Sequence, residues 1–200
     1  KIPNGTPLEC LGDGGEGSLS FCTAQLQQPA AEDYGFIHYS RLIFPASDKN
    51  FVRLREQSGH DDTLTLSGNG QKVHIVARRI HPKLSDFSGI NKDNFTARLY
   101  QGKPFYGTDD SIRKSVFAIE QITLNGQAVP AAELQGLFSP DFAATARGSN
   151  VYQGWEAYYR RTDKTLYLFN SVNNDAGSFG MCFVFKDGKF QRRYLWDALL

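Results

Sequence analysis

The stretch that decides the fold runs from Trp155 to Trp196. It begins Trp-Glu-Ala-Tyr-Tyr-Arg-Arg, Thr-Asp-Lys, Thr-Leu-Tyr-Leu-Phe-Asn-Ser and, after a polar loop, continues from Phe179 as Phe-Gly-Met-Cys-Phe-Val-Phe, Lys-Asp-Gly-Lys, Phe-Gln-Arg-Arg-Tyr-Leu-Trp. Aromatic and β-branched residues fill the runs, whereas Asp-Lys and Asp-Gly fill the gaps between them. We therefore predict an antiparallel meander of four strands, with Trp155, Leu166, Leu168, Phe183, Phe185 and Tyr194 on one buried face.

The rest of the chain also shows mainly the sequence pattern of β-strands. Short strands are predicted at 8–11, 19–26, 35–44, 51–55, 63–67, 71–80, 94–101 and 116–124. One convincing helix follows at 130–138, where proline stands in the first turn and glycine near the end, and a second helical turn is predicted at 140–147. The fold class is therefore all-β, a mainly antiparallel sandwich or partly open barrel with one or two short inserted helices.

Length and charge limit the function further. A chain of 200 residues is expected to form a single β-rich domain over 1–200, and the segment 102–115, which has no clear period, is the best candidate for an internal boundary. The net charge of +1 gives no overall field toward nucleic acid, and such binding would need a local patch. No apolar run reaches the roughly 18 residues that a membrane helix needs, so we predict no membrane span.

The cysteines and the start of the chain suggest an exported protein. Cys10 and Cys22 flank a glycine-rich turn, so a disulfide between them is predicted, with Cys182 free and buried. Three reduced cysteines, or a bridge between Cys22 and Cys182, are the alternatives. Because the chain begins at Lys1 without a methionine and has a turn-rich, aromatic composition, we expect a periplasmic or secreted location.

Sequence motifs for a cofactor or metal are weak. Gly12-Asp-Gly-Gly-Glu-Gly17 has the letters of a dinucleotide fingerprint, but a strand pattern rather than a helix follows, and its two carboxylates would repel phosphate. The four histidines show no zinc-ligand spacing. We therefore predict no cofactor and no metal.

Catalytic motifs are equally weak, and this favours a protein that is not an enzyme. Ser58-Gly-His60-Asp61-Asp62 combines a hydroxyl, an imidazole and carboxylates, but triads are assembled from distant segments and no G-x-S-x-G elbow presents the serine, so a polar turn between strands is the favoured interpretation. The alternative function is a hydrolase with a dispersed site. Its candidate residues are Asp61, Asp109 and Asp110 with His60 or His74.

Pairs of arginines in or beside predicted strands are the least expected feature. Strand alternation sends one member of each pair toward the core side, where a guanidinium needs a carboxylate, a carbonyl or a ligand. The candidate binding residues are Arg160, Arg161, Arg192 and Arg193 with Tyr158 and Tyr194. Arginine and tyrosine together suit a protein partner or an anionic or glycan ligand. We expect an extracytoplasmic binding protein that does not bind nucleic acid; the alternative is a set of solvated strand ends paired with Asp and Glu.

Overall fold

A computed structural model describes most of the chain. It gives residues 45, 48–60, 62–108, 110–138, 154–172 and 179–197, with the backbone alone for 171–172 and 196–197. Of the first part of the chain it gives the backbones of β1 (Glu9–Asp13), β2 (Phe21–Gln25) and β3 (Tyr34–His38). The helical turn predicted at 140–147 lies outside the described residues.

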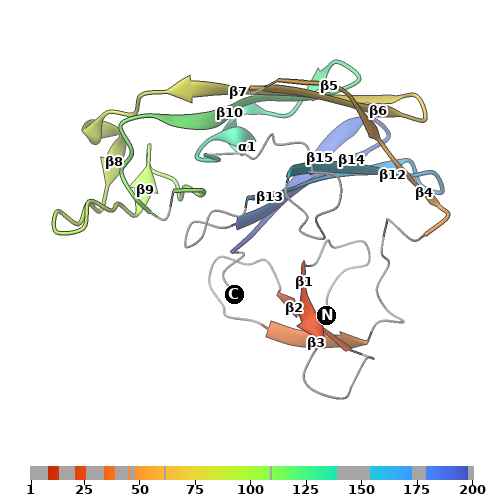
Figure 1. Cartoon of the computed structure of the whole chain (residues 1–200), viewed down its shortest axis with the longest axis horizontal. Coiled ribbons are helices and arrows are strands. Elements are labelled where there is room, and N and C mark those ends of the chain that lie inside the picture. Colours follow the sequence, from red (N-terminus) through yellow and green to blue (C-terminus); the bar gives the residue numbers. More distant parts are fainter. Residues whose placement is uncertain are drawn as a thin grey trace.

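Two five-stranded antiparallel sheets form a sandwich (Figure 1), which confirms the predicted all-β class. The first sheet has the order β11 (Gln127–Ala128), β10 (Val116–Leu124), β7 (Gln71–Ile80), β6 (Thr63–Gly68) and β5 (Arg55–His60). The second has the order β15 (Lys189–Asp197), β14 (Phe179–Lys186), β13 (Thr165–Val172), β12 (Gly154–Arg160) and β4 (Phe51–Arg53). The sheet of β1, β2 and β3 lies on the side of the second sheet that faces away from the first (Figure 1).

Tight turns set the register of the hairpins, as the sequence predicts. Asn69, Asn125 and Asp187 have positive φ angles of 50°, 51° and 50°, and the glycine after each is also positive. Two consecutive positive-φ residues match the right-handed twist of the flanking strands. The predicted four-strand meander is present as β12 to β15, and a turn of this kind at Asp187 and Gly188 joins β14 to β15.

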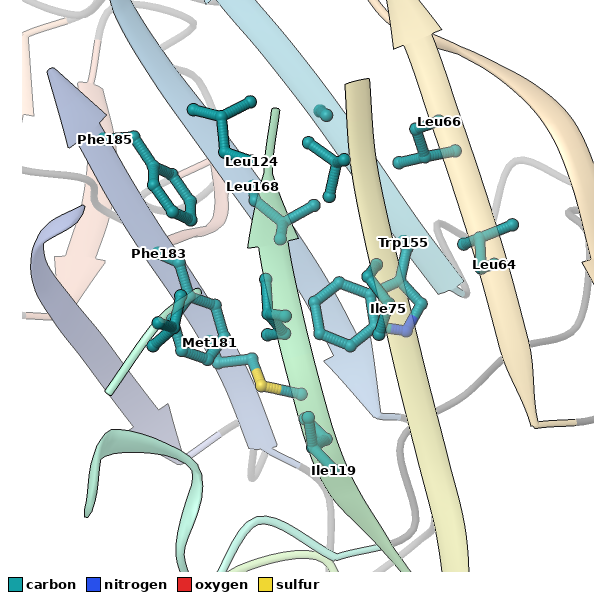
Figure 2. Packing of buried hydrophobic residues seen from close by; sticks show 14 of the residues in the cluster. Leu64, Leu66, Ile75, Ile119, Leu124, Trp155, Leu168, Met181, Phe183 and Phe185 are labelled. Atoms are coloured by element: carbon teal, nitrogen blue, oxygen red, sulfur yellow. The ribbon is translucent and has the colours of Figure 1, made fainter. Parts of the chain in front are cut away.

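The main core fills the space between the sheets (Figure 2). In β7, Val73, Ile75 and Ala77 are buried and alternate with more exposed neighbours. From the second sheet, Trp155, Leu166, Leu168, Phe183 and Phe185 point inward and belong to the same cluster. The inward face of the meander is thus as predicted for these five residues.

Two details of the strand predictions are wrong. Tyr194 packs on the outward side of the second sheet, because a bulge between Val184 and Phe185 shifts the register of β15 by one residue. Ser58 and His60, predicted in a polar turn, belong to the edge strand β5, whose side chains are all exposed. A polar edge strand lacks the apolar alternation by which strands are recognised in a sequence.

The chain changes sheets at Leu54, which is 3% exposed and whose amide donates to the carbonyl of Ala157 at 2.8 Å. In the chain, β4 ends directly before Leu54 and β5 begins directly after it, so the chain itself connects the two sheets at one lateral edge of the sandwich. The helix predicted at 130–138 is shorter in the structure, where it is α1 (Ala131–Leu134). This helix lies between the two sheets (Figure 1).

Residues 81–115 form a lobe at one end of the first sheet. It contains the 3₁₀ turn η2 (Leu84–Asp86) and the hairpin of β8 (Phe87–Ser88) and β9 (Leu99–Tyr100). A second apolar cluster holds the lobe on the sandwich, and its buried members are Phe87, Ala97, Tyr100, Phe105, Val116 and Phe138. The segment 102–115, predicted as a place for an internal boundary, contributes Phe105 and Ile112 to this cluster.

The cysteines fall in two places. Cys10 and Cys22 stand in the paired strands β1 and β2, opposite Ala24 and Asp13 respectively. Their side chains lie outside the described residues, and no disulfide is seen in the described part, so their bridge stays a prediction. Cys182 is free and 0% exposed, as predicted, and burial raises the pKa of its thiol well above the ordinary value.

Candidate functional site: the outer face of the second sheet

Aromatic and arginine side chains gather on the side of the second sheet that faces away from the main core. We call this set the aromatic–arginine face. Its members are Phe51, Arg53, Glu156, Tyr158, Arg160, Tyr167, Phe169, Arg192 and Tyr194. The set arises because every second residue of β4, β12, β13 and β15 points the same way.

Strand register places these residues in rows across the sheet. Arg53 stands opposite Tyr158, Tyr158 opposite Tyr167, Tyr167 opposite Val184, and Val184 opposite Arg192. Three strand spacings therefore separate Tyr158 from Arg192, about 14 Å. One row thus carries an arginine at each end with two tyrosines near its centre.

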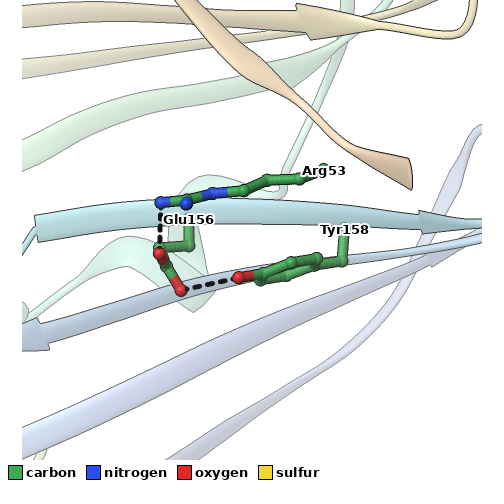
Figure 3. Close-up of polar contacts among 3 residues, drawn as sticks. All are labelled: Arg53, Glu156 and Tyr158. Atoms are coloured by element: carbon green, nitrogen blue, oxygen red, sulfur yellow. Dashed lines mark hydrogen bonds and ion pairs between the residues drawn. The ribbon is translucent and has the colours of Figure 1, made fainter. Parts of the chain in front are cut away.

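One end of the row is occupied by a three-residue contact (Figure 3). Arg53 forms an ion pair with Glu156 through its Nη2 atom, and the hydroxyl of Tyr158 donates to the other carboxylate oxygen at 3.1 Å. The Glu156 side chain is 18% exposed, so this carboxylate is partly withdrawn from water. Both of its oxygens are satisfied by neighbours on the same face.

Arg160 is held in a fixed position at the hairpin end of the sheet. Its Nε and Nη2 atoms donate to the two carboxylate oxygens of Asp163 at 2.8 and 2.5 Å. Its guanidinium also lies 5.7 Å from the ring centre of Phe51 and 5.5 Å from that of Tyr167. The hydrogen bonds lower the pKa of Asp163 and raise that of Arg160.

Arg192 is the contrasting case at the other end of the row. It is exposed, and its Nη1 atom donates to the Tyr194 hydroxyl at 3.4 Å. Among the described residues it has no carboxylate within ion-pair distance. Arg192 therefore keeps most of its donors available beside a tyrosine that is itself partly exposed.

Two of the six predicted binding residues lie elsewhere. Arg193 points toward the core side, where it reaches the backbone carbonyl of Glu133 and lies 3.8 Å from its carboxylate. Desolvation by burial lowers the pKa of Arg193. Arg161 is exposed in the turn after β12, and its backbone amide donates to the carbonyl of Asn50 at 3.0 Å. The face therefore unites Arg160, Arg192, Tyr158 and Tyr194, and leaves out the other two.

The centre of the face is packed rather than open. Tyr158 is 5% and Tyr167 6% exposed, and burial raises the pKa of Tyr167. The rings of Tyr167 and Phe169 stack with centroids 6.3 Å apart, and Tyr158 meets Phe169 edge to face. Polar groups are thus presented at the rims, above all by Arg53 and Arg192, which are exposed.

Sequence reasoning missed several members of the face. Tyr167 and Phe169 alternate with the inward Leu166 and Leu168, so the pattern of β13 alone could have shown them. Phe51 and Arg53 could not be found in this way, because their place beside β12 depends on a pairing across about a hundred residues of chain. No local pattern encodes a contact of that range.

The residues of the alternative hydrolase are not brought together in the described part of the chain. Asp61 and Asp109 lie outside the described residues. His74 lies on the outer side of the first sheet, where its Nδ1 atom is 3.0 Å from the hydroxyl of Thr65, its cross-strand neighbour. The described residues also contain no group of three or more His, Cys, Asp or Glu side chains that could hold a metal ion.

Comparison with known proteins adds no functional assignment. No family model, no curated protein and no solved structure matches this chain. Within the described residues, no helix is long and apolar enough to cross a membrane. A proposal about function must therefore rest on the geometry of the surface.

Proposed function

We propose that this chain is an extracytoplasmic binding protein that recognises an acidic protein partner through the β15 rim of the aromatic–arginine face. The observation that carries the proposal is the contrast between Arg192 and the two meander arginines Arg160 and Arg193. Arg160 and Arg193 have carboxylate partners in Asp163 and Glu133, whereas Arg192 stands exposed beside Tyr194.

The charge of this surface supports an acidic partner. Arg53, Arg160 and Arg192 stand on the face, and Lys186 and Lys189 flank it at the hairpin end of β14 and β15. The described acidic groups near these five cations are Glu156 and Asp163, which form ion pairs, Asp48, whose charge acts on Arg160, and Asp187 in the turn between Lys186 and Lys189. A surface with excess positive charge speeds association with an acidic surface and selects against a basic one.

The neighbouring tyrosines support a protein rather than a small anion. Tyrosine and arginine are enriched among the residues that dominate the energy of protein interfaces. Tyr194 presents a ring and a hydroxyl on a strand edge, and Tyr158 and Tyr167 form a packed base beside it. An exported location with a Cys10–Cys22 bridge belongs to the same proposal, because such a bridge persists only in an oxidising compartment.

Crosslinking can test the proposed surface while the partner is still unidentified. A photoreactive phenylalanine replaces Tyr194 in one variant and, as a matched control, Thr123 on the outer side of the first sheet. We expect a crosslinked species from position 194 in extract of the source cells, identified by mass spectrometry, that position 123 does not give. Adding Arg192→Glu should remove it, whereas Lys72→Glu should not. Identical products from both positions, or no effect of Arg192→Glu, would contradict the proposal.

A further inference from the structure

We propose that the lobe of residues 81–115 is a peripheral docking site for an anionic lipid bilayer, with Phe95 as the side chain that enters the membrane interface. This surface is separate from the aromatic–arginine face and does not depend on the function proposed for it. The inference rests on three observations about the lobe, namely its charge, its exposed apolar side chains and the backbone of its tip.

The lobe carries an excess of positive charge. Residues 81–115 contain six lysines and arginines against four aspartates, a net charge of +2, whereas the whole chain has +1. All six of these cations are exposed, and none of them forms an ion pair with another residue of the described part of the chain. The lobe thus provides the local patch that the overall charge lacks.

The exposed large apolar side chains of the described residues lie in the same lobe. The exposed large hydrophobic residues of the described part are Leu84, Ile90 and Phe95, at 57%, 36% and 63%, and all three belong to the lobe. Exposed apolar side chains among cations are the composition by which proteins bind the surface of anionic membranes. Nucleic acid would also be attracted by the cations, but binding of nucleic acid would not explain why leucine and isoleucine side chains are exposed.

The tip of the lobe holds Phe95 in an unusual backbone conformation. Its φ angle is 56°, in the left-handed region that a bulky side chain rarely adopts. The Asn91 amide donates to the Thr96 carbonyl at 2.9 Å, and the Ile112 amide donates to the Phe95 carbonyl at 2.9 Å. The Thr96 hydroxyl donates to Asn94 Oδ1 at 2.7 Å. A strained residue that its surroundings hold in place points to a role for that side chain.

The segments that form this tip carry three cations, and Asp93 and Asp110 lie in the same segments. Lys92 is in the turn itself, and Arg113 follows Ile112, whose amide bonds the Phe95 carbonyl. The Arg98 side chain lies over Gly89, where an added Cβ would come within 3.0 Å of it, beside Ile90. Figure 1 shows the β8–β9 hairpin at one end of the long axis of the molecule. The tip can therefore reach a flat surface without obstruction by the sandwich.

Vesicle flotation with the full chain tests the proposal. Vesicles of phosphatidylcholine alone are compared with vesicles in which about a third of the lipid is phosphatidylglycerol, at an ionic strength of roughly 0.15 M. We expect binding to the anionic vesicles and at least tenfold weaker binding to the neutral ones. Lys92→Glu with Arg113→Glu should weaken binding by about 25-fold or more, since each basic residue near the surface contributes about fivefold. Lys72→Glu with Lys164→Glu, the same charge change at two exposed positions at the other end of the sandwich, should have much less effect.

Phe95→Asn separates a functional from a structural role. Asparagine tolerates a left-handed backbone, so this variant should keep the fold and raise the thermal midpoint slightly while weakening vesicle binding about tenfold. Phe95→Trp should recover binding, and lipids brominated in the acyl chains should quench its fluorescence more than they quench the wild-type tryptophans. Equal vesicle binding by Phe95→Asn and wild type would overturn the proposal. Failure of the wild-type chain to bind anionic vesicles would also overturn it, and that result is expected if Phe95 fits a pocket in a protein partner instead.

Discussion

The two faces of the second sheet come from the same five strands and yet are built differently. Inward, Leu166, Leu168, Phe183 and Phe185 are at most 1% exposed and meet the first sheet. On the outward face, aromatic rings lie beside ion pairs. The guanidinium of Arg160, for example, lies over the ring of Tyr167 and forms hydrogen bonds with Asp163. Alternation alone separates the two faces, but it does not say which one is sealed. The more completely buried face is the one that packs on the five-stranded first sheet, whereas the smaller sheet of β1, β2 and β3 lies on the outer side (Figure 1).

The largest expected difference between the faces is in the free energy of unfolding. Phe183 is 0% exposed in the main core, whereas Phe169 is only partly buried on the outer face of the neighbouring strand. Phe183→Ala should destabilise by about 3–5 kcal/mol, because it leaves a cavity between the sheets. Phe169→Ala should cost about 1–2 kcal/mol, because little cavity remains where water can enter. Urea unfolding of both variants measures this, and equal losses would show that the outer face is as sealed as the core.

A smaller difference is expected between the neighbours Arg192 and Arg193. Arg193 is turned toward the core side, with 21% of its side chain exposed, and reaches Glu133. Arg193→Ala should cost about 1–3 kcal/mol, since it removes a charge-assisted contact and leaves a polar group unpaired. Arg192→Ala should change stability by less than about 0.5 kcal/mol, as is usual for exposed positions. Thermal unfolding of the pair checks the strand register, and the reverse order would mean that the bulge in β15 is placed wrongly.

The sequence predicted the strands better than it predicted the surface. The meander was readable because apolar runs alternate between Asp-Gly and Asp-Lys turns, and a short polar strand such as β5 was not. The bulge opposite Val184 reverses the direction of Tyr194 and decides that Arg193 rather than Arg192 points toward the core side, which simple counting by two cannot anticipate. Among the predicted binding residues, the arginines Arg160 and Arg192 lie on one face. Only the folded structure shows that Arg160 has a carboxylate partner there and that Arg192 has none among the described residues.

The smallest expected effect concerns the ion pair of Arg160 with Asp163, and its sign follows from the pKa shift. The hydrogen bond from Arg160 lowers the pKa of Asp163 below its ordinary value of 3.8 in the folded protein. A carboxyl whose folded pKa is lowered stabilises the fold above its unfolded pKa, and this contribution is lost as the pH falls through the folded pKa. Because 35% of the Asp163 side chain is exposed, solvent screening limits the gain to about 1 kcal/mol or less.

Asp163→Asn should therefore be slightly less stable than wild type near neutral pH, and the difference should shrink as the pH falls below about 4. Lys164→Gln, a charge change at the next residue of the same turn, serves as the control, because Lys164 is exposed and no ion pair is described for it. The measurement is the free energy of unfolding of all three proteins from pH 7 downward. A difference between Asp163→Asn and wild type that stayed constant to low pH would mean that the carboxylate is not the source of the stability. Arg160 would then be held over Phe51 and Tyr167 by its ring contacts alone, and it would be as free as Arg192 to meet a partner.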